Sequence, residues 1–318
     1  MTSTVAAAQM TVVEIPSWGE ADVLTVATRP IPAFGGRDVL IELDGIGVNP
    51  VDFKVRGGNY SAAFGEDFPM VLGRDFTGRV VDAGADVSSW KSGDEVLGTL
   101  RMDPRLGCYA THLVVTDAVL ARRPAGMSAA VAAALPVAGL TAWQAIVEVA
   151  MVSPGQRVLV QAAAGGVGHL AVQLAHYVGA EVIATASARN HEFLRSLGAS
   201  SVIDYTKDRF EDVVEPVDVV IDCVGGEVYE RSLHVLKPGG IAVTMASRPQ
   251  PELAESLGVR GALVFVRPDQ IQLEGLATMV ADGRLSVHVD RTFPLAEAAD
   301  AHRLQETGHV RGKLVLIP

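Results

Sequence analysis

The chain has 318 residues, of which 49% are hydrophobic, 20% are charged and 5% are aromatic, and its formal net charge is −11. This length suffices for two domains, and the composition is typical of a folded globular protein rather than a disordered one. The negative charge disfavours binding to nucleic acid or to an anionic membrane surface, because long-range repulsion opposes both. We expect neither as a partner.

Residues 1–20 lack a basic segment followed by an apolar core, so they do not resemble a secretory signal. No stretch reaches the roughly 18 uninterrupted apolar residues of a membrane-spanning helix. The two cysteines, Cys108 and Cys223, fit no metal-ligand spacing and are typical of free thiols in a reducing compartment. We therefore expect a cytoplasmic protein.

The first third of the chain consists of short alternating runs separated by turns, which predicts the strands of a β-rich domain. These runs are 39–48, 78–87, 94–100 and 110–115. Near Ala129 an alanine-rich helix begins, and apolar strands then alternate with helices to about residue 267. Such alternation predicts a doubly wound parallel sheet with right-handed crossovers. We expect an α/β protein with a β-rich domain at 1–123, a doubly wound parallel-sheet domain at 124–267, and a return to the first domain at 268–318.

The segment QAAAGGVGHL (161–170) follows a predicted strand and opens a predicted helix, as a dinucleotide-binding turn does. Ala163 stands where the first glycine of that turn usually stands, and a methyl group there leaves the phosphate contacts intact. The positions that approach phosphate, or let the helix pack on the strand, are Gly165, Gly166, Val167 and Gly168. The segment predicts a Rossmann turn.

The second strand of the parallel sheet ends near Ala186, where an NAD-selective site places an acidic residue against the ribose 2′-hydroxyl. This chain has no carboxylate there. Ser187 and Arg189 offer a hydroxyl and a guanidinium, and Tyr205 offers a phenol after the third strand, which suits a 2′-phosphate. Alternatively, Arg189 is a solvated residue at the start of a helix. The pattern favours NADPH over NADH.

Further segments carry a family resemblance. They are GVNPVDFKVRGG (47–58), FPMVLGRDFTG (68–78), GDEVLG (93–98), AALPVAGLTAWQAI (133–146) and TGHVRGKLVLIP (307–318). In these segments the chain resembles the medium-chain dehydrogenase/reductase superfamily, and more closely its zinc-free quinone oxidoreductases and alkenal/enone oxidoreductases. The resemblance spans almost the whole chain. It implies a GroES-like β domain and a Rossmann domain, with the cofactor in the cleft between them.

The chain departs from the zinc-dependent alcohol dehydrogenases at the metal site. Asn49 replaces a zinc-binding cysteine of those enzymes, Arg74 replaces a histidine, and the four-cysteine structural lobe is absent. His169 and His176 share a predicted helix, but we expect them to be buried or surface histidines rather than ligands. Without a Lewis acid, the favoured acceptor is one that delocalises the incoming charge, such as a quinone or an α,β-unsaturated carbonyl.

The resemblance also implies roles for individual residues. Asn49 and Lys54 would line the nicotinamide end, and Tyr60 would be a wall or a proton donor of the substrate pocket. Alternatively, Lys54 is a solvated charge, Tyr60 packs within its loop, and Arg74 and Asp75 form a buried ion pair. The residues expected to contact the cofactor are Thr141, Ala163, Gly165, Gly166, Val167, Ser187, Arg189, Tyr205, Cys223, Val224, Met245, Ser247, Phe265, Val266, Arg311 and Lys313.

These observations predict a zinc-independent, NADPH-dependent oxidoreductase that transfers hydride to a quinone or enone. One alternative is an enoyl-thioester or biosynthetic tailoring reductase, although the acidic chain shows no basic entrance for such a substrate. A more distant alternative is a non-enzymatic, NADPH-binding regulatory protein. The apolar run GALVFV (261–266) predicts an exposed edge strand that could pair across a two-fold axis, so we expect a homodimer.

Overall fold

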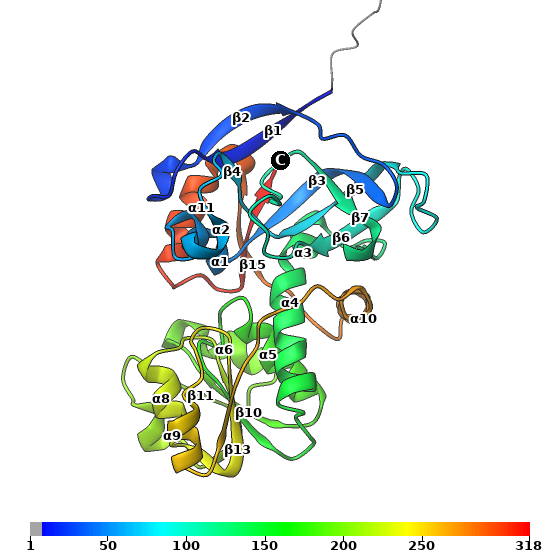
Figure 1. Ribbon diagram of the computed structural model, residues 1–318. Helices are drawn as coiled ribbons and strands as arrows, with labels where there is room; N and C mark the ends of the chain where they lie inside the picture. The colour runs from blue at the N-terminus through cyan, green and yellow to red at the C-terminus, as the bar shows by residue number, and fades with distance from the viewer. Residues whose placement is uncertain (1–7) are drawn as a thin grey trace, which may run out of the picture. The chain divides into compact units, whose positions relative to one another are not determined.

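The computed structural model describes residues 8–318. Residues 1–7 lie outside the described part. They are the start of segment 1–20, which we expect not to be a secretory signal. The chain divides into two compact units (Figure 1). Unit 1 runs through Val137 and also contains Pro268–Ala281 and Val289–Pro318, and unit 2 contains Ala138–Arg267 and Asp282–His288.

Unit 1 is built on two sheets. The larger sheet has the order β15 (Val289–Pro294), β16 (Lys313–Ile317), β3 (Asp38–Val48), β5 (Asp75–Ala83), β6 (Glu95–Thr99) and β8 (Leu120–Arg122), with β7 (His112–Thr116) also paired to β3. The smaller sheet has the order β2 (Thr25–Pro30), β1 (Gln9–Ile15) and β4 (Met70–Val71). All pairs are antiparallel except β15 with β16. This arrangement is the β-rich domain that the alternating runs predict.

The helices of unit 1 are short. They are α1 (Pro50–Arg56), α2 (Ser61–Phe64), α3 (Ala129–Ala134), α10 (Gln270–Ala281) and α11 (Ala298–Glu306), with 3-10 turns η1 (Ala21–Val23), η2 (Asp117–Val119) and η5 (Leu295–Glu297). The alanines of α3 let it lie directly on β3 and β5. A side chain at Gly47 would overlap the carbonyl oxygen of Ala133, so the close approach of helix and strand requires glycine there.

Unit 2 is a six-stranded parallel sheet with helices packed on it. Its strand order is β11 (Ser201–Ile203), β10 (Glu181–Thr185), β9 (Arg157–Val160), β12 (Val217–Asp222), β13 (Leu236–Thr244) and β14 (Arg260–Leu263). The helical segments are α4 (Pro136–Trp143), which begins in unit 1, η3 (Gln144–Val149), α5 (Gly168–Tyr177), η4 (Ala188–Asn190), α6 (His191–Ser196), α7 (Phe210–Val213), α8 (Glu227–Leu233) and α9 (Pro251–Ser256). Successive strands are added on one side from β9 to β11 and on the other side from β12 to β14, so the strand order reverses between β9 and β12. Ligands of such sheets bind at the carboxyl ends of the strands at this point.

The units differ from the predicted boundaries in two places. Residues 124–137 belong to unit 1, where α3 packs on the larger sheet. Residues 282–288 belong to unit 2. The side-chain amide of Gln173 on α5 holds the Ser286 backbone there, accepting its N–H at 2.7 Å and donating to its oxygen at 2.9 Å. The predicted α/β fold class, with a β-rich unit and a unit built on a doubly wound parallel sheet, is confirmed.

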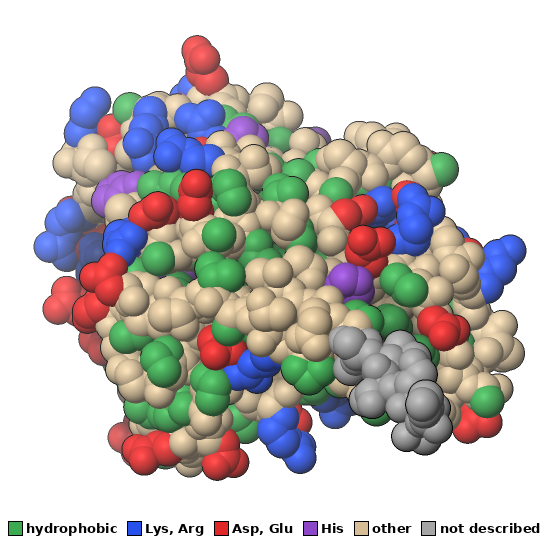
Figure 2. Space-filling view, turned by 90° about the horizontal axis from the view of Figure 1, so that it is seen from above, with side chains coloured by type: hydrophobic (Ala, Val, Ile, Leu, Met, Phe, Trp, Pro, Cys, Tyr) green, Lys and Arg blue, Asp and Glu red, His purple; other side chains and the backbone are tan. Residues whose placement is uncertain are grey.

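The surface charge and the helices of the protein are relevant to nucleic acid and membranes, the two partners that the composition disfavours. Lys and Arg side chains stand beside Asp and Glu side chains across the face shown in Figure 2, so the negative charge is not gathered into one patch there. Within residues 8–318, no helix combines the length and apolar character needed to cross a membrane.

Candidate functional site

The predicted cofactor residues of unit 2 share one location. Apart from Thr141, which is buried in α4, each of them follows the carboxyl end of a strand in the parallel sheet. Because the carboxyl ends of parallel strands meet at one edge, the fold brings these residues to the same edge. They are Ala163, Gly165, Gly166 and Val167 after β9, Ser187 and Arg189 after β10, Tyr205 after β11, Cys223 and Val224 after β12, Met245 and Ser247 after β13, and Phe265 and Val266 after β14.

The glycine-rich turn is held by short contacts. Ala163 N–H donates to Thr185 O at 3.1 Å, and Gly165 N–H donates to Ala162 O at 3.0 Å. The residue with left-handed backbone is Ala162, with φ 50°, so alanine at 163 needs no glycine-like conformation. A Cβ at Gly168 would lie 2.5 Å from Ala162 O, and glycine there is required for α5 to approach β9.

The two histidines of α5 do not form a ligand pair. The ring of His169 is fully buried, with Nδ1 2.8 Å from Gly165 O and Nε2 accepting the backbone N–H of His288 at 3.2 Å. These partners require the proton on Nδ1 and make His169 a support of the turn. His176 is exposed at the other end of the helix. Within residues 8–318, no group of three or more His, Cys, Asp or Glu side chains is arranged to hold a metal ion.

The region predicted to bind a 2′-phosphate lies after two neighbouring strands. Ser187 precedes the turn η4 and its carbonyl accepts the Asn190 N–H at 2.9 Å. Arg189 is exposed within that turn, and Tyr205, which follows β11, is 52% exposed. Since β10 and β11 are paired, these side chains rise from adjacent strand ends.

The loops after β12 and β13 are tied together by one buried carboxylate. Asp222 accepts the backbone N–H groups of Val224 and Gly225 at 3.0 Å each and the Thr244 hydroxyl at 2.8 Å. Beyond that hydroxyl, the Oγ of Ser247 is buried and has no hydrogen-bond partner in the described part of the chain. A buried hydroxyl without a partner is costly unless a ligand satisfies it.

Unit 2 therefore fits a dinucleotide. The turn after β9 presents backbone amides at the start of α5, where phosphate binds. Ser247 offers an unsatisfied hydroxyl at the same edge of the sheet. Val224 and Phe265 are 47% and 66% exposed, and they supply apolar surface that planar rings would cover.

In unit 1, Asn49 is the centre of a buried polar network. Asn49 is 3% exposed and joins β3 to α1. Its Nδ2 donates to Asp75 Oδ2 at 2.9 Å, and its Oδ1 accepts from Lys313 Nζ at 2.5 Å. Lys313 also donates to Val48 O at 2.8 Å, and Asp75 Oδ1 accepts the Val137 N–H at 2.9 Å. The network fixes the orientation of the Asn49 amide.

A second line of hydrogen bonds leads from this network to α11. The Asn49 backbone N–H donates to Asp52 Oδ2 at 2.8 Å, and the Tyr109 hydroxyl lies 3.1 Å from the same oxygen. Tyr109 also lies 2.9 Å from His302 Nε2, and Arg56 lies 3.3 Å from His302 Nδ1. Because arginine can only donate, His302 Nδ1 accepts, Nε2–H donates to Tyr109, and the Tyr109 proton points to Asp52.

Burial shifts the pKa values of this network. Desolvation raises the pKa of Asp52 to about 7 and, aided by the charge of Arg56, lowers the pKa of His302 to about 3. Desolvation also raises the pKa of Asp75 and lowers that of Lys313, and each partner's charge opposes the effect on the other. His302 is therefore neutral at physiological pH, as its hydrogen bonds require.

The expected ion pair between Arg74 and Asp75 is wrong. Both side chains are buried, but Asp75 is 3.6 Å from Lys313, and Arg74 Nε donates to Leu100 O at 2.9 Å. Asp75 begins β5 and Arg74 precedes it, so their side chains point to opposite faces of the sheet. Lys313, from the C-terminal strand, takes the place that the sequence assigned to Arg74.

The remaining predicted residues of unit 1 lie on or next to α1, α2 and β16. Lys54 is half-buried on α1, and Arg311 is half-buried just before β16. Tyr60 precedes α2 and its ring lies 6.4 Å from that of Phe64. Desolvation lowers the pKa of Arg74, and the charges of Asp75 and Asp52 oppose this effect.

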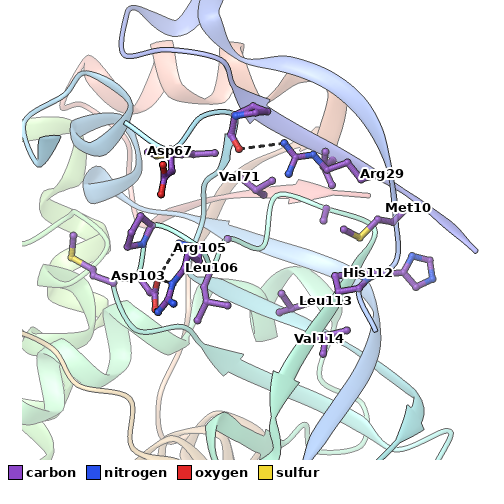
Figure 3. Close-up of a pocket in the computed structure, with 18 residues that line it drawn as sticks. Met10, Arg29, Asp67, Val71, Asp103, Arg105, Leu106, His112, Leu113 and Val114 are labelled. Atoms are coloured by element: carbon purple, nitrogen blue, oxygen red, sulfur yellow. Dashed lines mark hydrogen bonds and ion pairs between the residues drawn. The ribbon is translucent and has the colours of Figure 1, made fainter. Parts of the chain in front are cut away.

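Unit 1 also contains a cavity of about 770 Å³, large enough for a small organic ligand (Figure 3). Met10 and Arg29 enter it from β1 and β2, and His112 and Val114 from β7. Leu106 lies on the loop that closes the other side, where Arg105 is paired with Asp103 at 2.9 Å. The lining is a mixture of methionine, valine and leucine side chains with a few charges.

Comparison with known proteins agrees with this architecture. Residues 35–136 match the family described as alcohol dehydrogenase GroES-like domain, and residues 197–316 match the family described as zinc-binding dehydrogenase. A chloroplast envelope quinone oxidoreductase homolog of Arabidopsis thaliana is 34% identical over 91% of this chain and 92% of its own. An NADPH-dependent alkenal/one oxidoreductase of the same plant is 35% identical over 95% of this chain and 78% of its own.

Solved structures extend the comparison. The quinone oxidoreductase from Coxiella burnetii has a TM-score of 0.93 and 37% identity, covering 98% of this chain and all of its own. The Escherichia coli quinone oxidoreductase complexed with NADPH has a TM-score of 0.88 and 27% identity over 97% and 100%. The CurK enoyl reductase has a TM-score of 0.86 and 30% identity over 98% and 99%.

A GroES-like unit joined to a Rossmann unit with a dinucleotide-binding edge defines a two-domain pyridine-nucleotide oxidoreductase fold. With these matches, the chain belongs to the medium-chain dehydrogenase/reductase superfamily and, within it, to the quinone oxidoreductases. The family resemblance predicted from the sequence is thus confirmed.

Several residues of the site were missed by sequence reasoning. Asp52 follows Asn49 by three positions, the spacing at which a side chain caps the start of a helix, and this signal was available. Tyr109 and His302 are 193 positions apart, and no local pattern joins them.

Proposed function

We propose that this protein transfers hydride from NADPH to a quinone or an α,β-unsaturated carbonyl without a metal ion. The observation that carries the proposal is the edge of the parallel sheet after β10 and β11. A hydroxyl, a guanidinium and a phenol follow these strands, from Ser187, Arg189 and Tyr205, and no carboxylate follows β10. This donor set favours a 2′-phosphate over a free 2′-hydroxyl.

The fold supports specific roles for the residues that would hold NADPH. The amides of Gly165, Gly166 and Val167 would bind the pyrophosphate at the start of α5. Ser247 would give its unsatisfied hydroxyl to a ribose. Other lining residues would be Thr141, Ala163, Cys223, Val224, Met245, Phe265, Val266 and Arg311. When bound, NADPH supplies the hydride.

The proposed chemistry uses no zinc because the side chains at the expected ligand positions are of the wrong type. The Asn49 amide already has Asp75 and Lys313 as partners. Arg74 is a cation and cannot coordinate another cation. A conjugated acceptor suits such a site, since its charge moves along the conjugated system to an oxygen and the protein has to position it and supply donors. Lys313 acts here as a positioning residue for Asn49, while Lys54 and Tyr60 would lie on the acceptor side.

The test is the consumption of NADPH by the purified protein with three acceptors, a naphthoquinone, an alkenal and a crotonyl thioester. We expect turnover with the quinone or the alkenal, a preference for NADPH over NADH, and the same rate after treatment with a chelator. The similarity to CurK enoyl reductase supports an enoyl reductase as a second candidate, which the crotonyl thioester probes. Faster turnover of the thioester would replace the proposed acceptor class, and tight NADPH binding without any turnover would indicate a regulatory protein.

We also propose a cytoplasmic homodimer. Both cysteines are free thiols, as in a reducing compartment. The edge strand β14 exposes Leu263, so a second copy could extend the sheet there. The relatives from Arabidopsis bear chloroplast names, so imaging of a tagged full chain is the test of location. Light scattering of the wild type and of Leu263→Lys tests the dimer.

A further inference from the structure

Arg74 is a buried cation without a counter-ion. It is 8% exposed, and its Nε donates to the backbone oxygen of Leu100 at 2.9 Å. Within residues 8–318, its two terminal nitrogens donate to no protein group, and no carboxylate lies at ion-pairing distance. Burying an unpaired charge costs several kcal/mol, so such a group is retained where a ligand completes its environment.

The nearby carboxylates are engaged elsewhere. Both oxygens of Asp75 are occupied, by Asn49 and Lys313 on one side and by the Val137 N–H on the other. Asp52 accepts from Asn49 and Tyr109 through Oδ2. Arg74 is thus left with two terminal nitrogens that donate to no group of the described chain.

Arg74 and Asp52 line the same small cavity, of about 30 Å³. Its other walls are apolar on one side, with Val51, Val55, Phe64, Val71 and Leu72, and on the other side the loop adds Arg101, Met102, Asp103 and Leu106. Asp103 is already paired with Arg105. A cavity of this size holds an oxygen-sized group or one to two waters. It shares Val71, Met102, Asp103 and Leu106 with the cavity of Figure 3, so the two cavities adjoin.

The cavity also adjoins the residues that the proposed function assigns to the reaction. Asp52 is bonded to the backbone of Asn49, and the ring of Phe64 lies 6.4 Å from that of Tyr60. Arg74 would therefore meet the acceptor at its polar end, while the larger cavity next to it offers room for an apolar substituent.

We propose that this cavity is an oxyanion site, in which the terminal nitrogens of Arg74 bind the acceptor oxygen that becomes negative as hydride arrives. The inference rests on the proposed function. Hydride forms a C–H bond at the β-carbon of the enone, the C=C electron pair moves to the adjacent C–C bond, and the carbonyl pair moves to oxygen. The guanidinium stabilises the resulting enolate until water protonates it. A quinone accepts the same two electrons and leaves as a hydroquinone.

The first test is kinetic. In Arg74→Gln, we expect kcat/KM for the acceptor to fall about 100-fold or more, the loss typical for removal of an oxyanion donor, with the Kd for NADPH unchanged. The matched control is Arg79→Gln, since Arg79 is an exposed arginine on the neighbouring strand β5 and pairs with Glu95. We expect this control to behave as the wild type.

A second variant separates catalysis from simple charge balance. If Arg74 serves only to neutralise Asp52 through a bridging water, removing both charges restores function, and Arg74→Gln/Asp52→Asn matches Asp52→Asn in kcat/KM. Under our proposal, the double variant stays about 100-fold below the Asp52→Asn single variant even where its unfolding free energy recovers.

A binding measurement needs no turnover. 4-Nitrophenol resembles the anionic product and changes colour on ionisation, so its absorbance reports whether it binds as phenolate to the NADP⁺-saturated protein. We expect wild-type protein to lower the apparent pKa of the bound phenol and Arg74→Gln to leave it as in water. If wild type and Arg74→Gln perform alike with both phenol and acceptor, the oxyanion site is wrong. If the wild type binds phenolate through Arg74 but reduces no acceptor, the proposed function fails while the site stands.

Discussion

Lys313 donates a hydrogen bond to the side-chain oxygen of Asn49 across 2.5 Å, joining residues 264 positions apart inside unit 1. The contact leaves the Asn49 amide nitrogen to donate to Asp75. The C-terminal strand β16 thereby determines how Asn49 is presented, and Lys313 acts on the site from within the protein interior.

Replacing Lys313 by methionine should destabilise unit 1 strongly. Asp75 would be left as a buried charge without a cation, which costs about 3–5 kcal/mol. Urea denaturation measures the change. The matched control is Lys237→Met, because Lys237 pairs with Asp218 at 2.8 Å but is 42% exposed, and loss of such a pair costs about 1 kcal/mol or less. Equal losses in the two variants would contradict the assigned role of Lys313.

The stability of the protein should depend on pH through two opposing groups. Burial raises the pKa of Asp52 from 3.8 to about 7 in the folded state. Between these values the folded state holds more protons than the unfolded state, so the contribution of Asp52 to the unfolding free energy falls as pH rises. The pKa of His302 is lowered from 6.5 to about 3 in the folded state, so its contribution to the unfolding free energy rises with pH between these values.

Removing either group should reveal the other. Between pH of about 4 and about 6.5, we expect the unfolding free energy of Asp52→Asn to rise with pH relative to wild type, and that of His302→Gln to fall. Chemical denaturation at several pH values measures both slopes. The assignment of the shifts to this pair is untenable if the two variants change the slope in the same direction.

Arg189 should select for the 2′-phosphate. In Arg189→Gln, we expect the Kd for NADPH to rise about tenfold, corresponding to about 1.4 kcal/mol, while the Kd for NADH stays the same. Arg195→Gln is the control, because Arg195 is exposed on the following helix α6. Fluorescence titration with each nucleotide measures the Kd values. An equal loss of affinity for NADPH and NADH would contradict selection of the 2′-phosphate by Arg189 and would indicate a general electrostatic effect.

Gly168 should not tolerate a methyl group. In Gly168→Ala, the new Cβ would meet Ala162 O at 2.5 Å and Ala163 Cα at 2.7 Å, and backbone cannot move aside as a side chain can. We expect a loss of about 1–3 kcal/mol in unfolding free energy together with weaker NADPH binding. Gly165→Ala, where the nearest atom lies at 3.3 Å, should cost less by the same measurements.

The sequence was most informative about unit 2. Each apolar strand there is local, and the residues after it must lie at one edge, so Ser187, Tyr205 and Ser247 could be placed together from strand positions alone. The turn illustrates the limit of this reasoning. The motif predicts that Ala163 takes the place of a turn glycine, but the residue with left-handed backbone is Ala162. The spacing of the glycines does not specify this backbone angle.

Unit 1 was less accessible from the sequence. The predicted ion pair between Arg74 and Asp75 is wrong because neighbouring residues on a strand point to opposite faces of the sheet. The partner of Asp75 comes from β16, and that of Tyr109 from α11. Such contacts depend on how distant segments meet in the folded chain, which no single stretch of sequence specifies.

The central claim, metal-free hydride transfer from NADPH to a conjugated acceptor, is tested most directly with deuterium. NADPH labelled at the transferable position of C4 is given to chelator-treated protein with an enone, and the product is analysed by mass spectrometry. We predict one deuterium at the β-carbon and a rate equal to that of the untreated protein. Unlabelled product, or a rate that chelation abolishes and zinc restores, would contradict the claim.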